Sequence, residues 1–350
     1  MPPKREILFH FFGIFIPGTE EIVADILLSQ VPKAQIHHLG GGAAEFSAPV
    51  PYEKLNLFCF NNLFEMLYSS PADPSPKGLS GFLAGLTKAQ IDWAAVRRKG
   101  GGKTFRVMTS VKNQLTSVPK GLKADLEQKI MTKTGLRVDR GLADQEFLVT
   151  VRTDGRGYFL KRLTRHKSYD KLLHKGELHP ELAYMMCWLS APDAGDLAVD
   201  PFCGYGAIPR QRANRFPFKK IYALDIDLGS LEYAEESLRG IDNLDMRPWD
   251  ALKLSELLPA GSVDAIITDP PWGIYQQPPE ELCGFYRRML SQFCKVLRPD
   301  GTAVVLTGAK QEFDKAVAES PGFREISRYD ILVSGKKAAL WSLRRVPEEA

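Results

Sequence analysis

The sequence predicts an α/β protein in which an N-terminal α+β region precedes an open sheet of mostly parallel strands. From about residue 181 onward, apolar strand candidates alternate with longer helical patterns. The chain has 350 residues, enough for two or three domains of ordinary size. The halves also differ in charge: residues 1–180 carry 26 Lys and Arg against 17 Asp and Glu, whereas residues 181–350 carry 20 against 25.

Composition and cysteine usage narrow the class of protein. Hydrophobic residues make up 44% of the chain and charged residues 25%, which excludes collagen-like, disordered and coiled-coil proteins. The five cysteines are scattered and show no Cys-x-x-Cys spacing, so we expect neither a disulfide framework nor a zinc site. A reducing, cytoplasmic location follows as the expectation.

The N-terminal apolar run is predicted to be a buried strand. Residues 7–16 follow Lys4 and Arg5, as the apolar part of a secretion signal would. His10 interrupts the run, no small-residue cleavage site follows, and the run is shorter than the roughly 18 residues that indicate a membrane span. We therefore expect no membrane attachment.

The rest of the first half is predicted to form short helix and strand units. In chain order, we expect a helix over 19–30, a loop or subdomain boundary over 69–80, a strand over 104–111, a helix over 119–133, a strand over 146–152 and, after Gly155 and Gly157, an extended segment at 158–160.

Two clusters of basic residues in the first half indicate a polyanionic partner. The first comprises Arg97, Arg98, Lys99 and Lys103 around three glycines, and the second comprises Lys161, Arg162, Arg165, Lys167, Lys171 and Lys175, with Tyr169 and two histidines among them. Cations mixed with aromatic rings in one segment suit phosphate contacts combined with base stacking. The alternative for the second cluster is a solvated linker between domains.

The glycine-rich string around the first cluster ends like a phosphate-binding loop but does not complete that motif. Residues 97–104 begin with Arg97, where the motif needs a glycine. A strand is predicted to follow, where the motif requires a helix. Nucleotide hydrolysis is therefore not expected.

The second half supplies the strands of the predicted parallel sheet. They are expected at 197–200, 220–224, 263–268, 302–306, 331–333 and 338–344, with helices between them. Ser334 and Gly335 separate the last two and predict a hairpin that adds an antiparallel strand.

A pair of glycines follows the first of these strands. After Asp200 the chain continues through Gly204 and Gly206. Glycines here let the backbone approach a ligand at the carboxyl end of a parallel strand. A dinucleotide fingerprint would place a third glycine where this chain has Pro209, which disfavours a nicotinamide-dependent oxidoreductase and favours a ligand without phosphate.

Acidic residues also end the next strands. Asp225, which we prefer over Asp227, lies about 20 residues after the glycines, where a carboxylate can hold both hydroxyls of a ribose. Asp250, followed by Ala251, is placed to accept from an adenine amino group. Any one such aspartate is more commonly a helix cap or a solvated loop residue, but three at successive strand ends favour a nucleoside site.

The strand candidate at 263–268 ends in a turn with specific chemistry. Asp269, Pro270, Pro271 and Trp272 follow it directly. The two prolines fix the backbone so that the Asp269 carboxylate and the Pro270 carbonyl can face one exocyclic amine, while Trp272 offers a face for stacking. The alternative is an ordinary turn beside a core tryptophan.

The order of these motifs resembles that of the class I S-adenosylmethionine-dependent methyltransferases that modify exocyclic amines. The motifs are DPFCGYG (200–206), LDID (224–227), WDA (249–251), TDPPWG (268–273) and LRPDG (297–301). Upstream, PGTEEIVADIL (17–27), the segment 105–160 and LHPELA (178–183) are similar to the THUMP-domain RNA guanine-N2 methyltransferases, particularly their tRNA branch.

This resemblance implies a Rossmann-like seven-stranded methyltransferase sheet after an N-terminal ferredoxin-like and THUMP region. The implied parts are a ferredoxin-like domain at 1–68, a THUMP RNA-binding domain at 69–163, a basic linker at 164–190 and a methyltransferase domain at 191–350. The implied cofactor is S-adenosyl-L-methionine, held by Asp200, Phe202, Cys203, Gly204, Gly206, Asp225, Ile226, Asp250, Ala251 and Asp269.

The implied activity is methylation of the exocyclic N2 of a guanosine in tRNA, in or near the acceptor stem, by a monomer that needs no metal. Asp269, Pro270, Pro271 and Trp272 would form the catalytic turn, and the two basic clusters would bind the RNA. The alternatives are ribosomal RNA guanine or DNA adenine as the substrate, and an RNA-binding module with a vestigial cofactor fold. Trp272 stands where Tyr or Phe is commoner in the family, and Ala207 and Arg210 replace a hydroxyl and an acid.

Overall fold

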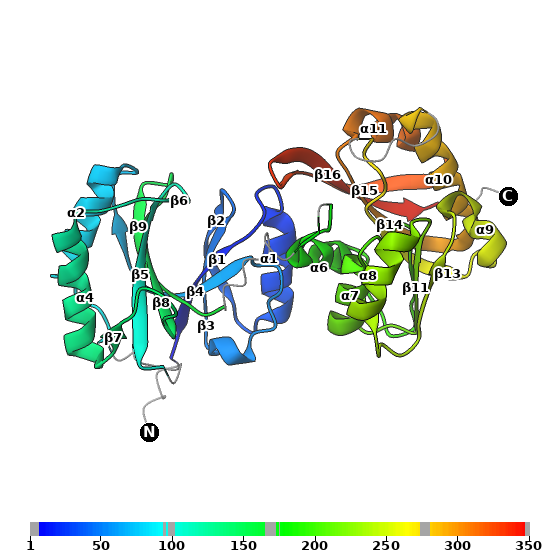
Figure 1. Cartoon of the computed structure of the whole chain (residues 1–350). Helices are drawn as coiled ribbons and strands as arrows, with labels where there is room; N and C mark the ends of the chain where they lie inside the picture. The colour runs from blue at the N-terminus through cyan, green and yellow to red at the C-terminus, as the bar shows by residue number, and fades with distance from the viewer. Residues whose placement is uncertain are drawn as a thin grey trace, which may run out of the picture. The chain divides into compact units, whose positions relative to one another are not determined.

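The structure is a computed structural model that describes residues 7–93, 96, 102–164, 173–174, 176–273 and 281–346. Contacts between Cα atoms divide the chain into two compact units. Unit 1 comprises Met1–Ile14, Leu28–Asn56 and Asn62–Lys167, and unit 2 comprises Phe15–Leu27, Leu57–Asn61 and Ser168–Ala350. Each unit has its own β-sheet (Figure 1).

Unit 1 is built on a nine-stranded sheet with the order β2-β3-β1-β4-β9-β8-β5-β6 and with β7 beside β5. The strands are β1 (Phe9–Ile14), β2 (Gln35–Gly40), β3 (Ala43–Ala48), β4 (Asn62–Pro71), β5 (Thr104–Val111), β6 (Gln114–Leu115), β7 (Arg137–Val138), β8 (Gln145–Val151) and β9 (Arg156–Arg162). The strand predicted over 104–111 coincides with β5. The strand predictions at 7–16, 146–152 and 158–160 correspond to β1, β8 and β9.

Strand β4 joins the two halves of this sheet. Its residues 62–65 pair with β1, and its residues 64–71 pair with β9 on the other side. The predicted boundary between residues 68 and 69 falls inside this strand. The division of unit 1 into two N-terminal domains therefore stays a prediction.

Helices α2 (Pro76–Leu86) and α4 (Lys120–Thr134) lie side by side and pack their apolar residues against the strands of unit 1 (Figure 1). Helix α4 confirms the helix predicted over 119–133. The loop predicted over 69–80 is confined to residues 72–75, because β4 extends to Pro71 and α2 begins at Pro76. Ser75 caps this helix by accepting a hydrogen bond from the Gly78 N–H (3.1 Å), and Pro76 occupies the first turn, a combination that starts helices. A short helical turn, η1 (Tyr52–Lys54), precedes β4.

Unit 2 contains the predicted open sheet, with the strand order β12-β11-β10-β13-β14-β16-β15. The strands are β10 (Leu197–Asp200), β11 (Lys220–Asp225), β12 (Leu244–Pro248), β13 (Val263–Thr268), β14 (Leu297–Thr307), β15 (Phe323–Val333) and β16 (Lys336–Arg345). All pairs from β12 to β14 are parallel, and β16 is antiparallel to β14 and β15. The predicted hairpin is confirmed: Ser334 and Gly335 both have positive φ (48° and 79°), as the tight turn of a twisted hairpin requires.

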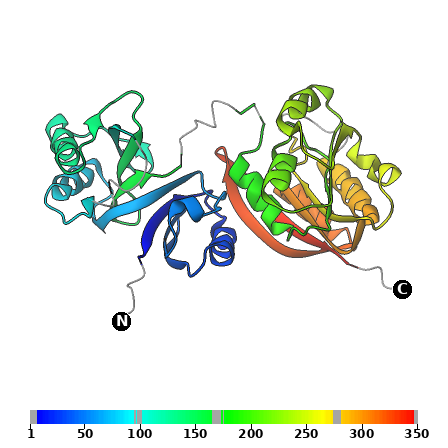
Figure 2. The ribbon, with the colours of Figure 1, turned by 90° about the horizontal axis from the view of Figure 1, so that it is seen from below.

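Helices cover both faces of this sheet (Figures 1 and 2). They are α7 (Ala207–Arg215), α8 (Leu228–Leu238), η2 (Ala251–Lys253), α9 (Leu254–Leu257), α10 (Leu282–Val296) and α11 (Lys310–Ala318). On β11, Leu224 packs in the apolar cluster of α10, whereas Ala223 packs in that of α8. Because successive strand residues point to opposite faces, α8 and α10 lie on opposite faces of the sheet.

Two further helices of unit 2 precede the sheet. Helix α1 (Glu20–Gln30), most of which falls in unit 2, confirms the helix predicted over 19–30. Helix α6 (Pro180–Leu189) occupies the C-terminal part of the predicted linker at 164–190, and its residues 181–187 are all buried. The rest of that linker stays a prediction. The Trp188 indole N–H on α6 donates to Asp25 on α1 (2.7 Å). In the part of the chain that the structure describes, no helix is both long and apolar enough to cross a membrane.

The strand order reverses at β10, with β11 and β12 on one side and β13 and β14 on the other. Open α/β sheets bind ligands outside the carboxyl ends of their strands at such a reversal. Asp200 and Asp225 end β10 and β11, and Asp250 and Asp269 follow β12 and β13 within two residues. The topology therefore brings these four aspartates to one edge of the sheet.

Candidate active site

The glycine loop after β10 is held against the neighbouring strand and helix. The Cys203 N–H donates to the Leu224 carbonyl and the Gly204 N–H donates to Asp225 Oδ2, both at 2.8 Å. Gly206 has φ +82°, and a Cβ there would lie 3.1 Å from the Leu238 side chain. Gly204 also has positive φ (48°), but open space surrounds the place of its missing Cβ. The loop thus leaves room on its outer side for a ligand to touch the backbone.

Asp200 offers a buried acceptor at the end of β10. Its Oδ1 accepts from the Thr268 hydroxyl (2.8 Å) and from the Phe202 N–H (3.2 Å). Its Oδ2 is buried and has no hydrogen-bond partner among the residues that the structure describes. Burial, together with the nearby Asp225 and Asp269, raises the pKa of Asp200 well above its ordinary value. A buried carboxylate oxygen of this kind needs a donor, and a cationic ligand group would supply one.

Asp225 links the glycine loop to the start of α8. Its Oδ2 accepts from Gly204, and its Oδ1 accepts from the Asp227 N–H (2.9 Å). Burial raises its pKa, while these backbone hydrogen bonds oppose the shift. Asp227 instead caps α8 by accepting from the Ser230 N–H (3.1 Å). Next to Asp225, Ile226 is 73% exposed, which leaves an apolar side chain open to a planar ligand.

Asp250 caps a helical turn, which is the commoner role of an aspartate at the end of a strand. Its Oδ1 accepts from the Leu252 N–H (2.9 Å) at the start of η2. Ala251 is buried. Contacts of these two residues with an adenine ring stay a prediction. Phe202 and Cys203, also predicted to hold the cofactor, face the protein: Phe202 packs against Phe285 (ring centroids 5.9 Å), and Cys203 is buried.

The turn after β13 is closed by a hydrogen bond between its first and last side chains. The Trp272 indole N–H donates to Asp269 Oδ1 (2.7 Å). Burial raises the pKa of Asp269 to about 7, and this hydrogen bond limits the rise. The indole ring also packs against Gly308, where a Cβ would lie 2.4 Å from Trp272 Cε3. The Trp272 ring, which is predicted to stack on a base, is therefore already engaged through its edge and its N–H. Trp272 nevertheless stays partly exposed.

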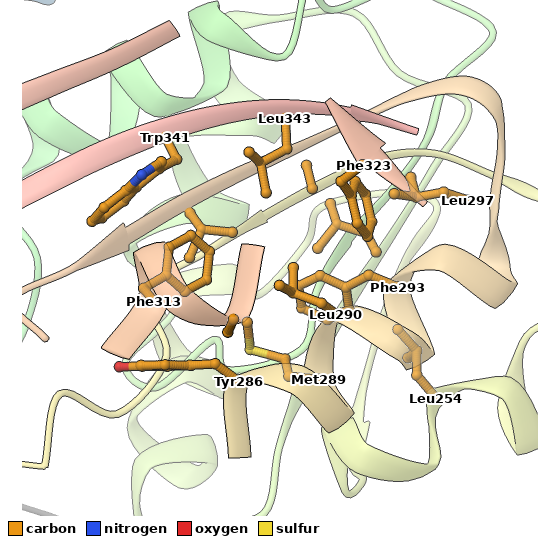
Figure 3. Packing of buried hydrophobic residues seen from close by; sticks show 14 of the residues in the cluster. Leu254, Tyr286, Met289, Leu290, Phe293, Leu297, Phe313, Phe323, Trp341 and Leu343 are labelled. Carbon is orange, nitrogen blue, oxygen red and sulfur yellow. The ribbon is translucent and has the colours of Figure 1, made fainter. Parts of the chain in front are cut away.

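Two buried residues that the sequence analysis does not single out hold the middle of this turn. The Tyr286 hydroxyl donates to the Pro271 carbonyl (2.8 Å) and lies 2.8 Å from the Thr307 hydroxyl. Figure 3 shows Tyr286 at one end of the apolar cluster, with its hydroxyl pointing away from the other labelled side chains. A polar tip on the apolar face of α10 is the sequence signal that could have identified it.

A stack of three rings lies beside the glycine loop. His174 stacks on Tyr205, with ring centroids 4.6 Å apart and planes at 13°, and also contacts Tyr233 of α8 (4.5 Å). Glu177 lies 3.7 Å from Arg210 of α7, the position where the family pattern has an acid. The short stretch before α6 is thus attached to the loop and to α7.

The structure separates the predicted RNA-binding residues into three groups. Lys103 is exposed. Lys161 is buried and donates to the Val96 carbonyl (3.0 Å), so the prediction that it contacts RNA directly is corrected. Arg162 pairs with Glu146 (2.5 Å), and its contact with RNA stays a prediction. The other predicted residues lie outside the described part of the chain: Arg97, Arg98, Lys99, Arg165, Lys167, Lys171 and Lys175.

Comparison with known proteins shows that the second half of the chain is similar to methyltransferases. Residues 167–338 match the UPF0020 family, described as an RMKL-like methyltransferase domain. The tRNA (guanine(6)-N(2))-methyltransferase THUMP3 of Bos taurus is 30% identical over 187 residues, which are 49% of this chain and 37% of that protein. The tRNA (guanine(10)-N2)-dimethyltransferase of Methanothermobacter thermautotrophicus is 29% identical over 200 residues, which are 53% of this chain and 55% of that protein. The matched region therefore spans about a third to a half of the length of these relatives.

A solved structure shares the fold along nearly the whole chain. The crystal structure of TrmN from Thermus thermophilus superposes with a TM-score of 0.76 at 22% identity, covering 97% of this chain and 100% of that one. The likeness confirms the predicted α/β fold class with its seven-stranded sheet.

Proposed function

We propose that this chain, whose residues 167–338 match the UPF0020 family of RMKL-like methyltransferase domains, methylates the exocyclic N2 of a guanosine in tRNA with S-adenosyl-L-methionine. The observation that carries this proposal is the turn after β13, where Asp269 and two prolines stand beside the glycine loop of β10. The two relatives described above are named for guanine N2 at tRNA positions 6 and 10. We take position 6, in the acceptor stem, as the first candidate.

The residues at the carboxyl edge of the sheet fit S-adenosyl-L-methionine. The unpartnered Asp200 Oδ2 would accept from its ammonium group, and the open side of Gly204 would admit its amino-acid part. Asp225 retains acceptor capacity for the ribose, beside the exposed Ile226. When bound, this cofactor would supply a methyl group on a sulfonium: the amine nitrogen bonds to the methyl carbon while the carbon–sulfur bond breaks and the sulfur leaves as a neutral thioether. The surrounding carboxylates favour a cationic ligand.

The turn after β13 would orient the guanine amine. This amine is a weak nucleophile, because its lone pair is delocalised into the ring. Asp269 Oδ2 and the Pro270 carbonyl would accept its two protons, which favours a pyramidal nitrogen with its lone pair directed at the methyl group. Since the pKa of Asp269 is about 7, its carboxylate can also take the proton that the nitrogen loses after methylation. A paired base must first leave its stack, at a cost of a few kcal/mol, and the partly exposed Trp272 ring would offset part of it.

The RNA would be held mainly by unit 1. Its exposed Lys103 and the basic residues outside the described part of the chain would contact phosphates, which positions RNA without reading sequence. We propose that the protein acts as a monomer in the cytoplasm. The five cysteines are all free, which supports a reducing compartment.

The test is to incubate the protein with total RNA and methyl-labelled cofactor, then to map the labelled nucleoside. We expect N2-methylguanosine in the acceptor stem, and loss of label with Asp269→Asn while tRNA affinity is kept. Label in ribosomal RNA or on adenine would replace the substrate we propose. Cofactor binding without any transfer would favour a non-catalytic RNA-binding module.

A further inference from the structure

The turn that would hold the guanine is fixed at three points by residues outside its motif. The Trp272 ring packs against Gly308, the Pro271 carbonyl accepts from Tyr286, and a Cβ on Gly273 would lie 2.7 Å from Leu282 Cδ1. Two of these contacts are close packing. The hydrogen bond to Pro271 is the directional one, because it fixes where a peptide carbonyl points.

The donors and acceptors around Tyr286 form a chain with one consistent direction. The Tyr286 hydroxyl has a single proton, which goes to the Pro271 carbonyl (2.8 Å). The Thr307 hydroxyl, 2.8 Å away, must therefore donate to Tyr286. Thr307 in turn accepts from the Ala309 N–H (3.1 Å). This series of hydrogen bonds runs from the end of β14, through α10, to the turn after β13.

Burial keeps this series of hydrogen bonds intact over the pH range in which activity would be measured. Tyr286 and Thr307 are both fully buried. Burial and the nearby Asp269 raise the pKa of Tyr286 above its ordinary value, so the hydroxyl remains protonated and remains a donor. An apolar cluster surrounds the Tyr286 ring, and phenylalanine would fill that space equally well (Figure 3). Packing alone therefore does not account for the hydroxyl.

A Pro-Pro turn passes this constraint to its neighbours. Each proline ring locks φ near −65°, so ψ is the one soft torsion left at each residue. Fixing the direction of the Pro271 carbonyl therefore restricts the Pro270 carbonyl and, through it, the Asp269 side chain. These are the two acceptors that would hold the guanine amine.

We propose that Tyr286 and Thr307 are positioning residues for methyl transfer, acting through the Pro271 carbonyl on Pro270 and Asp269. The inference rests on the proposed function, since it assigns a role in that reaction. It adds two side chains from α10 and β14 to a site otherwise built from strand ends and loops.

The experiment compares Tyr286→Phe, Thr307→Val and Thr307→Ser with the wild type in kcat, in KM for tRNA and in affinity for the cofactor. We expect Tyr286→Phe to lower kcat about 10- to 100-fold, the scale seen when reacting groups are misplaced by up to 1 Å, with cofactor affinity unchanged. Thr307→Val should give a smaller loss and Thr307→Ser should restore the rate. The double variant Tyr286→Phe/Thr307→Val should be no slower than Tyr286→Phe alone, because Thr307 acts through Tyr286.

A second readout does not depend on turnover. The chain has five tryptophans, and ¹⁵N labelling gives one indole signal for each, with Trp272 assigned through Trp272→Phe. Since the Trp272 N–H is bonded to Asp269, its signal reports the geometry of the turn. We expect Tyr286→Phe to shift this signal and to leave the other indole signals in place. Tyr184→Phe, at a buried tyrosine stacked on Phe216 away from the turn, is the matched control and should change neither readout.

The outcomes separate the two claims. Unchanged kcat and an unchanged Trp272 signal in Tyr286→Phe, with a lower melting temperature, would overturn the positioning role and leave Tyr286 as a core residue. If Tyr286→Phe does not fold, Thr307→Val and Thr307→Ser replace it. Unchanged kcat and an unchanged Trp272 signal in Thr307→Val would then overturn the positioning role. If the wild type transfers no methyl group, the proposed function fails, while the indole signal still shows whether Tyr286 sets the turn.

Discussion

The Trp272 indole N–H donates a hydrogen bond to Asp269 Oδ1 at 2.7 Å, across a turn that contains two prolines. One carboxylate oxygen is therefore occupied by the protein, and in the proposed function the other would accept from the substrate. Tyrosine or phenylalanine, which the family more commonly has at this position, carries no indole N–H.

Replacing Trp272 with phenylalanine should move the pH dependence of methyl transfer. The variant keeps an aromatic ring but loses the donor that stabilises the Asp269 carboxylate. The pKa of Asp269, about 7 with the donor present, should rise, so the acidic limb of the kcat profile should shift to higher pH. Asp200 and Tyr286 also couple to this carboxylate and are unchanged in the variant. Trp249→Phe, which removes an indole N–H bonded to the Lys253 carbonyl, is the control and should leave the profile in place.

Gly308→Ala should impair catalysis by pushing the indole away. The new Cβ would meet Trp272 Cε3 at 2.4 Å, so the ring must move and its bond to Asp269 is lost. We expect at least about a tenfold fall in kcat, as for a misplaced reacting group. Gly229→Ala on α8, where the Cβ would meet its nearest atom at 3.7 Å, should be neutral or slightly stabilising. Equal rates for the two variants would show that the indole position does not matter.

Asp200→Asn should weaken cofactor binding while stabilising the free protein near neutral pH. Burial raises the pKa of Asp200 in the folded state above its unfolded value of 3.8. The wild type therefore loses stability as the pH rises from the unfolded pKa towards the folded one, and an asparagine does not. Thermal melts should show the variant a few degrees higher at pH 8, with a smaller difference near pH 4. Adding cofactor should raise the melting temperature of the wild type and not of the variant; a normal rise in the variant would contradict the role given to Oδ2.

Lys103→Glu should reduce tRNA affinity and its salt dependence. An exposed lysine that contacts a phosphate contributes to counterion release, so the slope of log affinity against log salt should fall by about one. Lys161→Met should instead lower the melting temperature and leave the slope unchanged, because Lys161 is buried and bonded to the Val96 carbonyl. Filter binding across a salt series measures both variants. The opposite pattern would reverse the assignment of these two lysines.

Strand ends with a strong local pattern could be predicted from the sequence. β10 and β13 are short apolar runs that stop at an aspartate, and their bounds coincide with the predicted ones. β2 and β3 were not predicted, because His37, His38 and a run rich in Ala and Ser have little preference for strands. Their strand conformation comes from pairing with one another and with β1.

At the candidate site, the sequence identifies individual residues but not the contacts between their side chains. Asp269 and Trp272 could be identified from their motif, but their hydrogen bond depends on side-chain rotamers that no spacing encodes. Tyr286 and Gly308 lie on other elements and reach the turn only through the fold. Lys161 belongs to a basic cluster that was predicted to bind RNA, yet its side chain on β9 is buried.

Because β4 pairs with both β1 and β9, it limits where the N-terminal half can be truncated. A fragment that begins at residue 69 would keep three residues of this strand and would leave much of β9 without its ladder partner. Unpaired strand edges promote aggregation between molecules. A truncated protein intended for RNA-binding studies should therefore start before β1, where removing sequence leaves every strand of this sheet with its neighbours.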